Sequence, residues 1–174
     1  MFGYPLFLDL KGQRCLVFGG GEVATRKIEA LLKRGAEVRC VSREFSPPLR
    51  RLSRRKKSQL ILKRSKESAL PLAGARLVIA ATSDRNFNAR VAEACRKKKI
   101  WVNVVDDPEL CDFYVPAVLE RGPLQVAIST GGASPLFARR LREELEKVIP
   151  ASIGKMLEKL GTVRAKVQSL RKRK

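Results

Sequence analysis

The chain has 174 residues, enough for one domain or for one domain with a small appendage. Apolar residues make up 44% of it, and 37 basic residues against 17 acidic ones give a formal net charge of +20. The chain can therefore bury a hydrophobic core. Its charge indicates either a solvated basic surface or an anionic partner, which can be a nucleic acid, an anionic membrane surface or a polyanionic small substrate.

Four cysteines and no histidine restrict the metal and redox chemistry of the chain. No two of Cys15, Cys40, Cys95 and Cys111 have C-x-x-C spacing, which argues against a preformed zinc site. Cys15 and Cys40 lie in apolar runs, so we expect them to be buried as small hydrophobic residues. No stretch approaches ~20 consecutive apolar residues, and the start of the chain has no basic signal segment, so we expect no membrane span and a reducing, cytoplasmic setting.

Predicted strands and helices alternate along the first part of the chain. Apolar runs predict five strands, at 15–18, 37–41, 59–63, 76–81 and 100–105. Helical periodicity predicts two helices between them, at 23–32 and 86–98. Pro47-Pro48 interrupts the pattern, and a short basic stretch follows. The alternation predicts an α/β fold, with a Rossmann-type doubly wound parallel sheet over residues 1–113.

The pattern then changes. Two extended runs, at 114–119 and 124–129, predict a hairpin, and Ser134-Pro135 is suited to begin a helix. Because a lone hairpin is only marginally stable, we expect residues 114–150 to form a small α+β dimerisation region that packs against a second copy of the chain. Residues 151–174 are predicted to form a basic C-terminal helical segment.

A dinucleotide-binding motif follows the first predicted strand. The run Gly19-Gly20-Gly21-Glu22-Val23-Ala24 fits G-x-G-x-x-A and opens the first helix. The first glycine permits a tight turn, the third lets the backbone approach a pyrophosphate, and the helix N-terminus offers free N–H groups to the phosphates. The motif predicts that residues 19–23 bind NAD, against the alternative of a glycine-rich turn that binds no ligand.

Other candidate contacts lie at the ends of later strands. The fingerprint places an acidic residue at the ribose 2′-OH about 20 residues on, where the chain has Arg43-Glu44. Glu44 could take that role, and Arg43 could instead accept the 2′-phosphate of NADP, so both cofactors stay open. Thr82 and Asn103 are expected to face the same crevice and to bind the nicotinamide side or the substrate, unless each only stabilises a turn.

Several motifs, in order, resemble one family. They are Pro5 to Leu10, Cys15 to Lys27, Ala80-Ala81-Thr82, Asn103 to Pro108, Cys111-Asp112-Phe113, Val115-Pro116-Ala117 and Ala127 to Pro135. Over about residues 5–150 the chain resembles the precorrin-2 dehydrogenases and sirohydrochlorin ferrochelatases of siroheme synthesis. The resemblance implies NAD-dependent oxidation of precorrin-2 to sirohydrochlorin and a homodimer, and in bifunctional members also insertion of ferrous iron. The methyltransferase domain of longer siroheme synthases is not expected in 174 residues.

Asp106 is the candidate general base. It follows a predicted strand at the edge where open α/β sheets bind ligands, and an ionised carboxylate there can accept the proton that leaves with a hydride. The same carboxylate could accept a pyrrole proton during metal insertion. On the residues alone Asp106-Asp107-Pro108 is more simply an ordinary turn, and the resemblance favours the catalytic interpretation. A basic protein also suits a polycarboxylate such as this tetrapyrrole substrate.

A function from another class is a non-enzymatic NAD-sensing or nucleic-acid-binding module. Residues 50–66 contain nine Lys or Arg and no acid, which would suit nucleic acid. Aromatic residues are absent there, so stacking on single strands is unsupported. The motifs at 103–108 and 129–135 favour the enzyme, since a sensor has no need of both. We therefore predict a tetrapyrrole substrate, with neither nucleic acid nor membrane as a partner.

Overall fold

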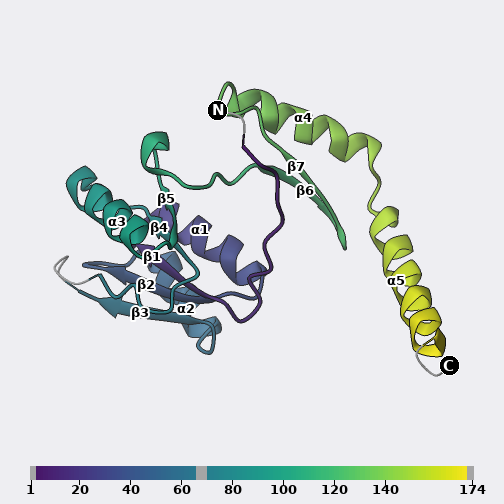
Figure 1. The fold of residues 1–174 in the computed structure, drawn as a ribbon, viewed down its shortest axis with the longest axis horizontal. Helices are drawn as coiled ribbons and strands as arrows, with labels where there is room; N and C mark the ends of the chain where they lie inside the picture. The colour runs from purple at the N-terminus through teal and green to yellow at the C-terminus, as the bar shows by residue number, and fades with distance from the viewer. Residues whose placement is uncertain (1–2, 66–69, 172–174) are drawn as a thin grey trace. The chain divides into compact units, whose positions relative to one another are not determined.

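The computed structural model describes residues 3–65 and 70–171, which form two compact units. The first unit is Leu6–Tyr114, and the second joins the described residues of Val115–Lys174 and Met1–Pro5. Figure 1 labels the helices and strands of both. Among the described residues, no helix is both long and apolar enough to cross a membrane.

The first unit is a five-stranded parallel sheet with helices between the strands. Its elements are β1 (Arg14–Phe18), α1 (Glu22–Lys33), β2 (Glu37–Ser42), α2 (Pro47–Arg55), β3 (Leu60–Arg64), β4 (Leu77–Ala80), α3 (Arg85–Lys97), β5 (Trp101–Val104) and the 3₁₀ turn η1 (Pro108–Leu110). The strand order is β3-β2-β1-β4-β5, and every pairing is parallel. The predicted doubly wound sheet is confirmed, and its order reverses beside β1, where such sheets bind dinucleotides.

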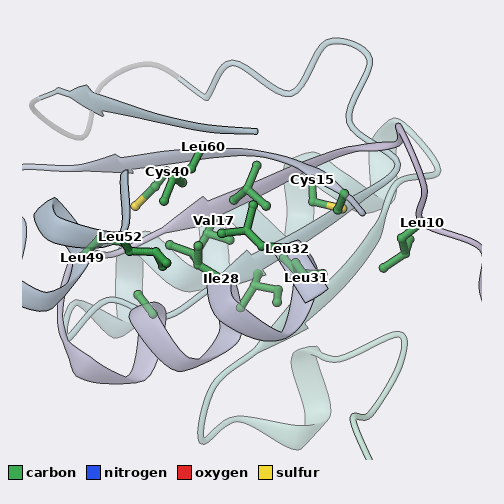
Figure 2. Packing of buried hydrophobic residues seen from close by; sticks show 14 of the residues in the cluster. Leu10, Cys15, Val17, Ile28, Leu31, Leu32, Cys40, Leu49, Leu52 and Leu60 are labelled. Atoms are coloured by element: carbon green, nitrogen blue, oxygen red, sulfur yellow. The ribbon is translucent and has the colours of Figure 1, made fainter. Parts of the chain in front are cut away.

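The central strands β1 and β4 are buried on both faces of the sheet, which explains why they are continuous apolar runs. On one face Cys15 and Val17 of β1 pack with α1 and α2, and on the other Leu16 and Phe18 pack with α3. Figure 2 shows Ile28 of α1 pointing toward Val17. The predicted burial of Cys15 and Cys40 is confirmed at 0% exposure, and burial raises their pKa values to about 11 and about 12.

Helix α2 corrects the expectation that the two prolines only interrupt the pattern. Pro47 stands at the first helical position, where its missing N–H is no loss and its fixed φ suits a helix. Ser46 caps the helix by accepting a hydrogen bond from Leu49 N (3.3 Å). Leu49 and Leu52, three residues apart, bury one face of the helix against the sheet. The prolines therefore begin a basic helix.

The second unit contains a hairpin and two helices. They are β6 (Ala117–Arg121), β7 (Leu124–Ile128), α4 (Pro135–Val148) and α5 (Ser152–Arg171). The strands pair antiparallel, and Ser134 caps α4 by accepting from Phe137 N (3.1 Å), as predicted. Arg121 ties the hairpin to the far end of α4 by donating to the carbonyls of Ile149 (3.0 Å) and Glu146 (3.1 Å).

Candidate dinucleotide site

The glycine loop between β1 and α1 is fixed on both sides by backbone contacts. Gly19 has φ +111° and donates to Val41 O (3.0 Å), and Gly20 O accepts from Ser46 N (2.8 Å). A Cβ atom on Gly19 would collide with the carbonyl of Ala81, and one on Gly20 with the carbonyl of Glu44. The motif predicted the tight turn at Gly19, whereas the need for glycine at position 20 comes from the segment after β2.

Gly21 differs from the other two glycines of the loop. A Cβ atom built there has nothing within 4 Å, so this stretch of backbone is open to a ligand. Gly21 is also the N-cap of α1 and provides no side-chain hydrogen bond, whereas Ser46 and Asp84 cap α2 and α3. The first N–H groups of α1 are therefore available to an anion, and the helix dipole favours a phosphate there.

A cavity of about 780 Å³ opens beside this loop. Ligand pockets typically measure roughly 300–1,000 Å³. The cavity is lined by Phe18, Gly19, Gly20, Gly21, Glu22, Val23, Val41, Ser42, Arg43, Glu44, Phe45, Ser46, Pro47, Ser65, Ala81, Thr82, Ser83 and Phe87. It therefore brings together residues 19–23, Arg43, Glu44 and Thr82 from the predicted set. Asn103 and Asp106 are not among its lining residues.

Thr82 lines the cavity, but its hydroxyl is engaged by the start of α3. The hydroxyl lies 2.7 Å from Asn88 Oδ1, and Asp84 N donates back to it (3.3 Å). Asn88 Nδ2 in turn donates to Thr82 O (3.0 Å). Asn88 is 4% exposed and escaped the sequence reasoning, because an asparagine inside a predicted helix gives no signal of a cap-like role. The side chain of Thr82 thus shapes the cavity wall.

The structure places Asn103 inside β5, 7% exposed, where it does not reach the cavity. Its Nδ2 donates to Phe113 O (3.0 Å) and lies 3.4 Å from Cys111 Sγ. Both partners belong to the segment that folds back along β5. The geometry therefore supports the alternative role for Asn103, that of holding a turn.

Asp106 begins that segment in a left-handed conformation, with φ +61°. Aspartate is one of the few residues that tolerate this region. Cys111 Sγ accepts from Val104 N (3.2 Å) and lies 3.3 Å from Asp107 O. Asp112 adds two hydrogen bonds to the same strand. Val102 N donates to its carboxylate (3.0 Å), and its own N–H donates to Val102 O (2.8 Å). Cys111 and Asp112, which follow Asp106 by five and six residues, are thus bonded to Val104 and Val102 of β5.

Lys27 lies within electrostatic range of Asp106. Burial lowers the pKa of Lys27, Arg26 lowers it further, and Cys111 and Asp106 raise it. Lys27 is on α1, so the charge of Asp106 acts on the helix that begins at the glycine loop. Burial is also the main cause that raises the pKa of the Cys111 thiol, which favours a protonated structural role for this cysteine.

Comparisons with known proteins agree with this geometry. A family model described as "Putative NAD(P)-binding" matches residues 6–117, and one described as "Sirohaem biosynthesis protein central" matches residues 121–147. The solved structure named "SirC, precorrin-2 dehydrogenase" is 33% identical, covers 94% of this chain and 79% of its own, and superposes with a TM-score of 0.79. This chain belongs to the precorrin-2 dehydrogenase family.

Longer relatives are more similar to this chain in sequence than that solved structure is. Siroheme synthase 1 of Serratia proteamaculans is 44% identical over 164 residues, and the siroheme synthase of Methylococcus capsulatus is 46% identical over 165 residues. Each match covers 94% of this chain but only 34% of the relative, so the chain spans about a third of their length. The suspected family and the α/β fold are confirmed, and the first unit is an NAD(P)-binding domain.

Four of the motifs that carry the family resemblance have two structural roles in the first unit. Residues 19–23 and Thr82 line the cavity. Asn103 and Cys111-Asp112-Phe113 instead bind one another and hold the segment that carries Asp106. In this precorrin-2 dehydrogenase family member, the second group of motifs therefore holds the segment that carries Asp106 against β5.

Proposed function

We propose that the chain oxidises precorrin-2 to sirohydrochlorin, with NAD as the hydride acceptor. The observation that carries the proposal is the carboxyl edge of the parallel sheet. There the open backbone at Gly21 follows β1, and Asp106, held at φ +61°, follows β5. When bound, the nicotinamide supplies the two-electron oxidation, and the chain has to orient the substrate and accept a proton.

Asp106 is proposed to accept that proton. A carboxylate that is ionised near neutral pH can act as a general base if it is held within reach of the reacting carbon. The hydrogen bonds of Cys111 and Asp112 to the backbone of β5 fold back the segment that carries Asp106 along that strand. Insertion of ferrous iron would use the same acceptor for pyrrole protons, and it stays a prediction for this site.

The net charge of +20 is proposed to attract the polycarboxylate substrate. Guanidinium groups match carboxylates in geometry and charge, and the chain is rich in arginine. We still predict that neither nucleic acid nor a membrane is a partner. The cytoplasmic location also stays a prediction. Rising salt should weaken substrate binding by screening, whereas saturable RNA or DNA binding at physiological salt would favour the alternative function.

The decisive experiment is anaerobic turnover of precorrin-2 with NAD by the purified chain. We expect NADH and sirohydrochlorin to form in equal amounts, and the reaction to depend on both substrates. A chain that binds NAD but leaves precorrin-2 unchanged would contradict the dehydrogenase and favour a sensor.

We also propose a homodimer formed through the second unit. Leu136, Phe137 and Val148 of α4 are 60%, 59% and 76% exposed, although the helix buries Ala138. A hairpin and two helices with so little buried surface need a further partner for stability. A second copy of the chain in twofold symmetry is the commonest solution.

A further inference from the structure

Helix α5, drawn in yellow in Figure 1, carries a narrow apolar stripe along its exposed surface. Six of its apolar residues recur at alternating intervals of three and four, which is the a/d pattern of a helix in a coiled coil. Five of the six are between 46% and 65% exposed. These six residues form the α5 stripe, which consists of Ile153, Met156, Leu160, Val163, Val167 and Leu170.

The helix touches the hairpin of its own unit through a different side. Gly154 is its buried residue, and a Cβ atom there would lie 2.9 Å from the backbone of Arg121 at the end of β6. With Ile153 as position a of the heptad, Gly154 is at position b, outside the α5 stripe. Gly161, one heptad later, is a poor helix former that meets nothing within 4 Å, so this helix would gain stability from a partner.

Basic residues flank the α5 stripe on both sides. Lys159 and Lys166 are at position g of the heptad, and Arg164 and Arg171 are at position e. Among the residues that the structure describes, none of these four forms an ion pair. Three bases of α4 pair with glutamates of their own helix, so the two helices differ in this respect. The charge beside the α5 stripe has no counter-charge in the described chain.

This charge pattern decides which occupant fits the stripe. If a second copy of α5 lay there, position g would face e in a parallel pair, and like positions would face each other in an antiparallel pair. Either arrangement would place lysine and arginine opposite each other, which costs affinity. Glutamates at e and g of a different helix would instead form ion pairs with all four bases. A membrane surface fits less well, because α5 has no aromatic anchor and its apolar stripe is only two positions wide.

We propose that the α5 stripe binds an acidic amphipathic helix of another protein. The partner has apolar residues at its a and d positions and carboxylates at e and g, and it packs along about 27 Å of α5. This surface lies outside the reaction proposed above and would join the enzyme to a second protein.

Fluorescence anisotropy with the full chain at physiological salt tests the proposal. The probe is a labelled synthetic peptide of three heptads, with leucine at a and d and glutamate at e and g. We expect a micromolar Kd. A peptide with lysine at e and g should bind at least about tenfold more weakly, and so should a scrambled peptide of the acidic composition. The scrambled peptide controls for the general attraction of a basic protein for acids.

Variants of the chain separate the apolar contacts from the ionic ones. The double variant Leu160→Ser/Val163→Ser should keep its fold by circular dichroism, because both side chains are exposed, and should bind the acidic peptide at least about tenfold more weakly. Arg164→Glu/Lys166→Glu should reverse the preference between the acidic and the basic peptide. Lys155→Glu, at position c of the same helix, is the matched charge control and should keep the affinity within threefold.

Three outcomes would overturn the proposal. The first is equal binding of the acidic heptad peptide and its scrambled form. The second is binding of phosphatidylserine vesicles or of a DNA duplex that Leu160→Ser/Val163→Ser abolishes, with no binding of the acidic peptide. The third is a dimer by light scattering that dissociates in this double variant, since a second copy would then occupy the α5 stripe. Turnover of precorrin-2 does not enter this test, so the two proposals fail separately.

Discussion

Single residues at this site can be tested cleanly because some of their substitutions keep the backbone intact. Asp106→Asn is the clearest case, since asparagine has the same shape and also tolerates φ +61°. The variant should fold and bind NAD but lose about 10²–10⁴-fold in the rate of NADH formation, because an amide cannot accept the proton. Single-turnover kinetics with precorrin-2, together with a separate NAD titration, measures both properties. A rate within about threefold of the parent would show Asp106 to be a turn residue.

Gly21→Asp tests the cofactor loop in the same way. A side chain at position 21 meets no atom within 4 Å, and the N-cap has φ −82°, so the variant should fold as the parent does. Its carboxylate would lie where the pyrophosphate of NAD is expected and would repel it, so NAD binding should weaken at least about tenfold. Calorimetry measures the affinity, and circular dichroism confirms the fold. Unchanged affinity in a folded variant would place the nucleotide elsewhere.

How far the residues could be assigned from sequence depended on whether their partners are local. Gly19 and Gly21 were predicted because a turn and a helix start are short-range features. Asn103 was expected in the crevice, but its amide binds Phe113 O, ten residues later, and only the folded path of the chain shows this. The need for glycine at position 20 likewise comes from a distant residue, because the carbonyl of Glu44, which follows β2, lies against it.

At the scale of elements, side-chain hydrogen bonds hold the segment after β5, whereas regular secondary structure contributes little. Cys111→Ala would leave the buried N–H of Val104 without its sulfur acceptor and would lower the free energy of unfolding by about 1–3 kcal/mol. We expect kcat to fall while the NAD affinity stays within threefold, because the cavity lining does not include Cys111. Cys111→Ser should restore part of kcat, since a hydroxyl can accept the same bond. Thermal unfolding and steady-state kinetics measure both effects, and an unchanged kcat in the alanine variant would exclude a positioning role.

The elements themselves were largely evident from sequence, with one instructive exception. The central strands, which are buried on both faces, are continuous apolar runs, and five apolar runs in all predicted the sheet. Helix α2 was missed because Pro47-Pro48 suggested an interruption and its remaining residues are mostly arginine. Only Leu49 and Leu52 mark its buried face, and two apolar residues are too few to establish a helical period.

At the scale of the whole molecule, the sequence predicted a Rossmann domain (1–113), a dimerisation region (114–150) and a C-terminal segment (151–174), but it gave no direct evidence of what covers the dimerisation region. The exposed apolar side chains of α4 are the structural reason to expect a partner. Such a face in contact with water lowers solubility, and a twofold contact would bury it on both copies at once. The interface would then also link two NAD(P)-binding domains in one particle.

Phe137→Glu tests this assembly. Phe137 is 59% exposed on the first turn of α4, so a carboxylate there is tolerated in the isolated chain, whereas in an apolar interface it would be buried without a partner. We expect the parent to have the mass of a dimer by light scattering at micromolar concentration, and the variant to dissociate at least about tenfold more readily. Ile61→Glu is the matched control, because Ile61 is 55% exposed on β3 of the first unit. This substitution should leave the mass unchanged. A monomeric parent would contradict the dimer, and a dimer unaffected by Phe137→Glu would move the interface away from this face of α4.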